Sequence, residues 1–151
     1  MKQLAIAVFV CVLPLHLSAG PVDRYQSITD DLRTRLQILE RVTFTVVEHN
    51  PLVMSVETFG GRSGPFVISA DKVFLKTLNE KELEAAIAHE LGHVWIHTHH
   101  PYLQTERLAN DIALRVTGAD VLVPVYEKVW ERIGARGNLA EYISLEVKQQ
   151  Q

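Results

Sequence analysis

The feature that most constrains the fold is the segment between Asn79 and Pro101, whose pattern predicts one long helix. Asn79 is a favourable N-cap residue, and Glu82 three positions later completes a capping box. Pro101 pushes the residue before it out of the α region, so the helix should run from residue 80 to residue 96 or just beyond. Apolar residues recur along one face of this helix: Leu83, Ile87, Leu91 and Val94. The helix should therefore bury one side in a core.

A second face of the predicted helix carries His89 and His93 at four-residue spacing. Residues four apart project from the same face about one turn apart, so both imidazoles can reach one ion. The His-Glu-x-x-His pattern is typical of zinc (Zn²⁺) peptidases. A chance occurrence of this short pattern is the competing interpretation, and the capped, amphipathic helix on both sides of it argues against chance.

Glu90 follows a predicted ligand directly, so its carboxylate cannot easily bind the same ion. It suits instead a general base, which takes a proton from water held at the zinc and passes one to the leaving amine. The sequence does not rank the groups that could stabilise the oxyanion. The candidates are Tyr102, Tyr126, Arg115 and His49.

A catalytic zinc site needs a third protein ligand and one open position, and Glu106 is the predicted third ligand. Glu106 lies thirteen residues after His93, and Pro101 between them predicts a helical hairpin. Small alanines share the face of Glu106, which would let the returning helix approach closely. The competing interpretation of Glu106 is a surface glutamate in the first turns of a helix. His97 also competes as a ligand, but three histidines in line on one straight helix diverge along its axis.

The first nineteen residues have the layout of a secretory signal peptide. Lys2 gives a positive start, residues 4–15 are apolar, and Ala19 offers a small residue at the cleavage point. The apolar run is short for a membrane span, although an uncleaved anchor is the competing interpretation. We therefore expect export to the periplasm or secretion, without a stable membrane span. Cys11 would leave with the signal, so zinc must be held by nitrogen and oxygen ligands.

Residues 20–151 are expected to form a single domain, because this length allows one compact core. The expected strands are 43–47, 52–59 and 66–69, with a glycine-rich hairpin loop at 60–65. The expected helices are 25–42, 80–96, 101–117, 121–133 and 139–147. This order predicts an α+β fold, in which a small antiparallel sheet packs on the histidine-bearing helix and the C-terminal half is helical.

Three segments of the chain resemble a known group of metallopeptidases. Residues 78–94 look like the active-site helix of the HtpX, CAAX-prenyl-protease (Ste-type) and OMA-type metalloendopeptidases, which are gluzincins. Residues 106–110 are similar to their Glu-x-x-Ala-Asp segment, and residues 117–120 stand where they often have Ala-Gly-Tyr-Asp. The resemblance covers about residues 44–133. It implies a zincin-type fold and a downstream glutamate, here Glu106, as the third zinc ligand.

Two departures from that group matter. The stretch between His93 and Glu106 is much shorter than in most of its members, as in the compact soluble forms called minigluzincins. Asn110 stands where the group has an aspartate that contacts a ligand histidine; it can accept the same hydrogen bond but carries no charge. The ImmA-type peptidases also have Glu-x-x-Ala-Asn, but the chain resembles them less upstream of the motif.

Together these patterns predict a zinc metalloendopeptidase acting on extended peptide or unfolded protein, which could bind along the sheet edge. The net charge of −3 gives no support to a nucleic-acid partner. The alternative is a zinc-binding, non-catalytic or regulatory module of the same fold, which the short length and Asn110 favour. Glu90 argues against it, because a structural zinc site has no use for that carboxylate. The sequence leaves open whether residues 20–42 shield the cleft as a pro-segment.

Overall fold

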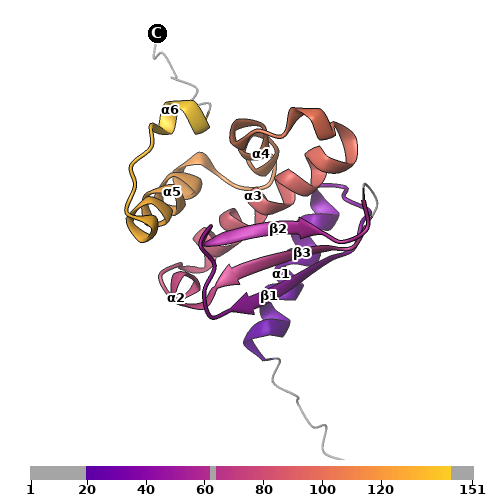
Figure 1. Ribbon diagram of the computed structural model, residues 1–151, viewed down its shortest axis with the longest axis horizontal. Helices are drawn as coiled ribbons and strands as arrows, with labels where there is room; N and C mark the ends of the chain where they lie inside the picture. Colours follow the sequence, from indigo (N-terminus) through magenta and orange to yellow (C-terminus); the bar gives the residue numbers. More distant parts are fainter. Residues whose placement is uncertain (1–19, 62–63, 144–151) are drawn as a thin grey trace, which may run out of the picture.

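The computed structural model describes residues 20–61 and 64–143, so the predicted signal peptide lies outside the described residues. It confirms the α+β class (Figure 1). The elements in chain order are α1 (Pro21–Arg35), β1 (Val42–Val47), β2 (Met54–Thr58), β3 (Phe66–Asp71), α2 (Lys72–Leu75), α3 (Glu80–His99), the 3₁₀ helix η2 (Pro101–Leu103), α4 (Glu106–Ala113), α5 (Ala119–Ile133) and α6 (Leu139–Tyr142).

The sheet is mixed, in the order β1–β3–β2, which corrects the prediction of a wholly antiparallel sheet. β2 and β3 form the predicted antiparallel hairpin, whereas β1 pairs with β3 in parallel. The chain reverses once between β1 and β2 and again between β2 and β3, so β1 and β3 run in the same direction. β3 holds the central position, and its residues Phe66, Ile68 and Ala70 are almost fully enclosed. β1 lies at one edge of the sheet and β2 at the other.

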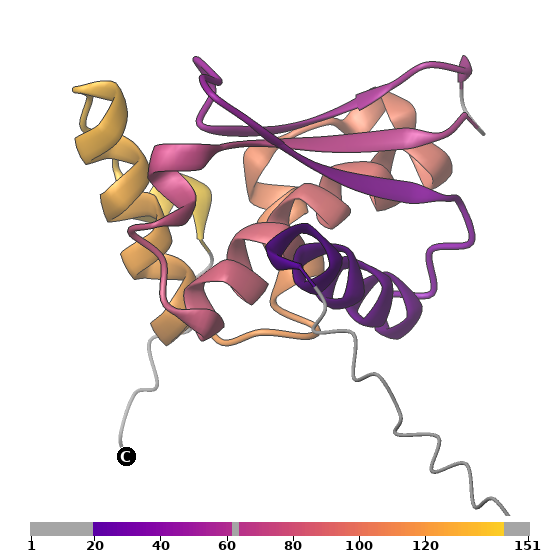
Figure 2. The ribbon, with the colours of Figure 1, turned by 90° about the horizontal axis from the view of Figure 1, so that it is seen from below.

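α1 and α3 form a layer beneath the sheet, with the main core between them (Figure 2). α1 ends at Arg35, earlier than the predicted residue 42, because Gln37 adopts a left-handed φ of 59° and turns the chain toward β1. The Gln26 side chain ties α1 to β1, accepting from Phe44 N (2.8 Å) and donating to Val42 O (2.9 Å). None of the described residues of α1 lines the cavity between α3 and β2; the helix packs on α3 and β1 through buried residues such as Leu32.

The helical hairpin of α3 and α4 forms close to the predicted position. Asn79 and Glu82 make the reciprocal capping-box hydrogen bonds at 3.0 and 2.7 Å. α4 begins at Glu106 and ends at Ala113, which corrects the predicted span of 101–117. Pro101 starts a 3₁₀ turn instead, and Thr105 in extended conformation caps α4 by accepting from Leu108 N (3.2 Å).

Gly92 lets the two helices of this hairpin meet. A Cβ built at Gly92 would overlap the carbonyl oxygen of Ala109 and lie 2.9 Å from its Cα. Gly92→Ala should therefore push α4 away, lowering the free energy of unfolding by about 1–3 kcal/mol in urea denaturation and displacing Glu106. Gly20→Ala is the control, because its Cβ meets only Asp23 Oδ2 at 3.6 Å. Equal stability of the two variants would contradict this packing.

α5 stands beside α3 at the end of the sheet where α2 begins (Figure 2). Polar contacts hold it there: Lys128 Nζ lies 2.6 Å from Glu82 Oε2, and Arg132 Nη2 lies 3.3 Å from the buried Asp71 carboxylate. α6 is shorter than the predicted 139–147, and residues 144–147 lie outside the described residues. Within residues 20–61 and 64–143, no helix is long and apolar enough to span a membrane.

Candidate metal centre

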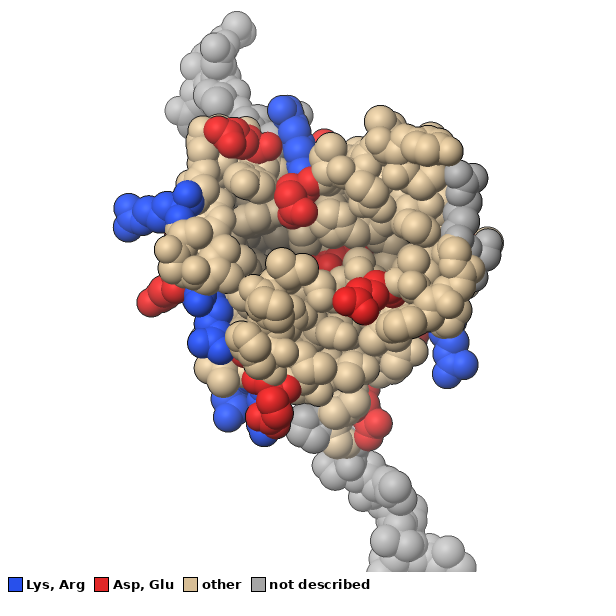
Figure 3. Space-filling view, viewed as in Figure 1, with Lys and Arg blue, Asp and Glu red and all other residues tan. Residues whose placement is uncertain are grey.

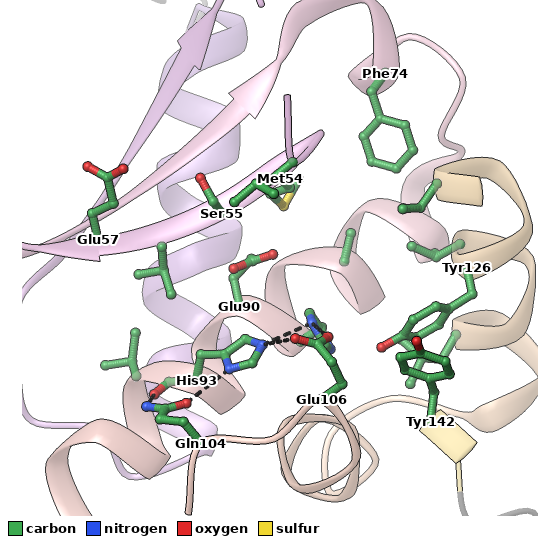
Figure 4. Close-up of a pocket in the computed structure, with 18 of the residues that line it drawn as sticks. Met54, Ser55, Glu57, Phe74, Glu90, His93, Gln104, Glu106, Tyr126 and Tyr142 are labelled. Atoms are coloured by element: carbon green, nitrogen blue, oxygen red, sulfur yellow. Dashed lines mark hydrogen bonds and ion pairs between the residues drawn. The ribbon is translucent and has the colours of Figure 1, made fainter. Parts of the chain in front are cut away.

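Three predicted ligand side chains converge between α3 and α4. The Nε2 atoms of His89 and His93 are 3.2 Å apart, and the Glu106 carboxylate oxygens lie 3.2 Å from the first and 3.4 Å from the second. Both imidazoles are largely buried, whereas Glu106 is half exposed. Figure 4 shows Glu106 reaching from α4 toward His93. Among the described residues, these three form a group that can hold a metal ion.

Asn110 determines which nitrogen of His89 carries the proton. Its Nδ2 donates to the Tyr142 carbonyl oxygen (2.7 Å) and to the Tyr126 hydroxyl (2.8 Å). A carbonyl oxygen only accepts, so Asn110 Oδ1 must be the atom that faces His89 Nδ1 at 2.7 Å. His89 therefore carries its proton on Nδ1 and directs the lone pair of Nε2 toward His93 and Glu106. The sequence resemblance indicated this position for Asn110, and the structure brings the two side chains together.

Gln104 does the same for His93, and sequence reasoning did not single it out. Its Nε2 donates to the His93 carbonyl oxygen (3.1 Å), so its Oε1 accepts from His93 Nδ1 (3.1 Å). Gln104 lies between η2 and α4, where no periodic pattern marks a buried face. Only the hairpin geometry brings it against the ring.

The donor set fits a divalent cation. Two neutral imidazoles present lone pairs at Nε2 and Glu106 presents a carboxylate, so the three groups converge with no proton between them. When protons take the place of the ion, the hydrogen bonds that Nε2 of His89 and of His93 donate to Glu106 hold the pKa of that carboxyl group well below its usual range. Burial alone would lower the pKa of His93. The hydrogen bond to Glu106 and the nearby charge of Glu90 raise it by more, so the net change is an increase. The site thus attracts positive charge, and its nitrogen and oxygen ligands suit zinc.

Glu90 lies beside this group without joining it. Its side chain points from α3 toward β2, between Ser55 and His93 in Figure 4, and only 7% of the residue is exposed. Burial raises its pKa, and the nearby His89 and His93 offset only part of that increase. A carboxylate with a raised pKa is a better proton acceptor, as a general base requires.

Gln104→Ala is expected to weaken zinc binding by about tenfold to a hundredfold, because outer hydrogen bonds orient metal ligands. The measurement is a competition titration with a zinc chelator of known affinity. Gln104→Glu keeps an acceptor for His93 Nδ1 and should retain most of the affinity. If Gln104→Ala binds zinc as tightly as the parent, the Gln104 hydrogen bond does not hold the ring.

The remaining candidates are His97 as a ligand and the four oxyanion groups, and they differ in whether they line the cavity. His97 lines the cavity with its ring edge against Phe66 (5.5 Å between ring centroids), and its Nε2 is buried without a hydrogen-bond partner. It is not part of the group that can hold an ion. Of the four oxyanion candidates only Tyr126 lines the cavity, with its ring centroid 5.9 Å from that of His89. The other three lie elsewhere: Tyr102, Arg115 and His49.

The centre opens into a cavity of about 550 Å³. One wall is formed by α3, with residues that include Ala86, Glu90, His93 and His97. All of β2 lines the opposite wall. The edge strand and the metal-centre helix therefore flank one cleft. Figure 3 shows the corresponding hollow, with acidic side chains at its border.

Comparisons with known proteins extend the fold assignment. No family model matches the sequence, and no curated protein matches it. Among solved structures, the chain is similar to the crystal structure of the metallopeptidase zymogen abylysin from Pyrococcus abyssi. The two share 14% sequence identity with a TM-score of 0.53, over 76% of this chain and 99% of that one. The likeness shows that this chain has a metallopeptidase-like fold, while membership of the HtpX group stays a prediction.

Proposed function

We propose that the protein is an exported zinc-dependent metalloendopeptidase that hydrolyses peptide bonds in extended or unfolded protein. The observation that carries the proposal is the convergence of His89, His93 and Glu106 with the buried carboxylate of Glu90 beside them, facing the same cleft. A structural zinc site would have closed its fourth position with a protein ligand. Here the described residues supply three candidate ligands and a separate carboxylate.

The two histidines and Glu106 would hold the zinc, with Asn110 and Gln104 orienting the imidazoles. Zinc, when bound, supplies a Lewis acid that polarises the substrate carbonyl and lowers the pKa of water toward neutrality. Glu90 accepts the proton of the attacking water and then donates it to the leaving amine nitrogen. The raised pKa of Glu90 supports both transfers, because the carboxyl group must be able to hold the proton between them.

Tyr126 is the best-supported group for the oxyanion among the four candidates. Its hydroxyl oxygen accepts a hydrogen bond from Asn110, which leaves the hydroxyl proton available to donate into the cavity. Burial raises the pKa of Tyr126, so the hydroxyl group keeps that proton at neutral pH. A hydrogen-bond donor aimed at a developing negative charge stabilises the transition state.

The edge strand supports an extended substrate. Within the described part of the chain, β2 pairs only with β3, so its outer edge faces the cleft, where the Val56 backbone N–H donates a hydrogen bond to Glu90. A peptide could add to this edge as a further strand, with its backbone held by hydrogen bonds. Most backbone groups of a folded substrate are already paired within its own structure, which is why the proposal specifies extended or unfolded chains.

Zinc removal and restoration test this function. The full chain, treated with a chelator, should lose cleavage of an unstructured protein such as reduced casein, and one equivalent of zinc should restore it. The measurement is product formation by gel and mass spectrometry, with magnesium addition as the control. If the zinc-loaded protein cleaves no peptide across a broad library, the alternative of a zinc-binding module replaces the enzyme.

A further inference from the structure

Three connections between elements lie together at one end of the molecule. The sheet register pairs both Val42, at the start of β1, and Thr58, at the end of β2, with Phe66. The α1–β1 and β2–β3 connections therefore leave the sheet at the same end. The ring of His97 lies against Phe66 (5.5 Å between ring centroids), so α3 ends there as well and η2 follows. All three connections lie on the right-hand side of Figure 1 and of Figure 2.

Large apolar side chains project into solvent from these connections. Tyr102 and Leu103 of η2 are 93% and 55% exposed. Leu39, before β1, is 90% exposed, and Phe59, after β2, is 71% exposed. None of the four lines the cleft or the cavity between α5 and α6. We call these four side chains the apolar tips, because each extends from a connection and not from the wall of a cavity.

The same connections carry little charge. Their described residues are 36–41, 59–61, 64–65 and 100–105. The charged side chains among them are Glu40, which is half-buried, and Arg41, which is exposed. At the opposite end of the sheet, by contrast, Lys72 and Glu48 form an exposed ion pair (2.7 Å). Because removing a charge from water is costly, the end with the apolar tips can enter an apolar medium at much lower cost than the opposite end.

We propose that the apolar tips form a peripheral membrane-binding surface and insert into the headgroup layer of a lipid bilayer. This inference does not depend on the proposed function. Tyrosine suits that layer because its ring is apolar and its hydroxyl group is polar, and phenylalanine and leucine are typical of surfaces that insert there. Separate loop tips can enter a fluid layer, whereas a protein partner requires a packed, complementary surface. Arg41 can contact the negatively charged groups of lipids.

The apolar tips are continuous with the cleft. Phe59 directly follows β2, and Leu103 directly precedes Gln104, whose side chain orients His93. Glu57 and Gln104 line the end of the cleft that is nearest the apolar tips. A bilayer held by the apolar tips would therefore border this end of the cleft.

The first test reports the surroundings of single side chains. Phe59→Cys, Tyr102→Cys and Val73→Cys are made separately with Cys11→Ala in the full chain, so that each protein carries one thiol for a polarity-sensitive fluorophore. With vesicles of equal parts phosphatidylcholine and phosphatidylglycerol, emission from positions 59 and 102 should shift to shorter wavelength. Position 73 is the exposed control at the opposite end and should not change. The signal is local, so a retained N-terminal segment does not produce it. No shift at 59 and 102, or an equal shift at 73, overturns the proposal.

The second test titrates these vesicles against the signal from position 102. Leu39→Ser and Phe59→Ser should each raise the lipid concentration at half-maximal shift by about tenfold, the effect of losing one buried apolar side chain. Both side chains are exposed, so the variants should melt with the parent. Val22→Ser is the matched control, an exposed residue in the first turn of α1, and should leave the titration unchanged. High salt should also leave it unchanged, because the apolar tips are uncharged. Parent-like titration of both tip variants, or a signal abolished by salt, contradicts insertion of the apolar tips.

Light scattering distinguishes a bilayer from a second copy of this chain. If the apolar tips join two copies, the parent forms a concentration-dependent dimer that the combined Leu39→Ser and Phe59→Ser variant does not form. That result, with no fluorescence shift on adding vesicles, replaces the bilayer with a dimer and overturns the proposal. The expected result is the same molar mass for both proteins without lipid.

Discussion

Glu90→Gln is expected to lower kcat/KM for an unstructured protein by about a hundredfold to ten-thousandfold, the contribution of a well-placed general base. Glutamine keeps the shape of the side chain but cannot accept the proton. Because Glu90 is outside the group that can hold the ion, bound zinc should stay at the parent level. Because the carboxylate is buried, a neutral amide in its place should not lower the melting temperature.

Glu84→Gln is the matched control for that variant, since Glu84 lies on the same helix but outside the cavity. It should keep parent activity. The measurements are initial rates at several substrate concentrations, metal analysis and thermal melting. If Glu90→Gln cleaves as fast as the parent, the base lies elsewhere and the mechanism assigned to α3 fails.

Alanine at His89, His93 or Glu106 is expected to lower zinc affinity by more than the roughly hundredfold lost when an outer hydrogen bond is removed. Each variant takes away a donor atom itself, and activity should be lost with the metal. His97→Ala is the control, because His97 lines the same cavity outside the group of three. Full zinc binding by Glu106→Ala together with loss in His97→Ala would show that the third ligand was misassigned.

Local signals explain why α3 and its two histidines could be predicted. The cap at Asn79, the stop at Pro101 and the four-residue spacing of His89 and His93 all lie within one segment. Glu106 could be predicted for a similar reason, because it follows His93 after a short turn marked by Pro101. The start of α4 was missed by several residues because Pro101 was assumed to begin it, although Thr105 before Glu106 is itself a good N-cap.

The features that escaped prediction depend on tertiary contacts. Gln104 gains its role only when the turn folds back over His93. The parallel pairing of β1 follows from the insertion of β3 between its neighbours, which strand propensity does not report. The contribution of α5 to the cavity also escapes prediction, because helical periodicity marks Leu122, Val125 and Tyr126 as buried but does not show that they also line a cleft.

The most direct measurement of the metal centre is an anomalous difference map at the zinc absorption edge, from crystals of the zinc-loaded full chain. The account predicts one strong peak per chain, within bonding distance of Nε2 of His89 and His93 and of the Glu106 carboxylate, with Glu90 facing the open position. Zinc–nitrogen distances should be about 2.0–2.1 Å. A peak at His97, His99 or His100 instead, or no peak between α3 and α4, would contradict it.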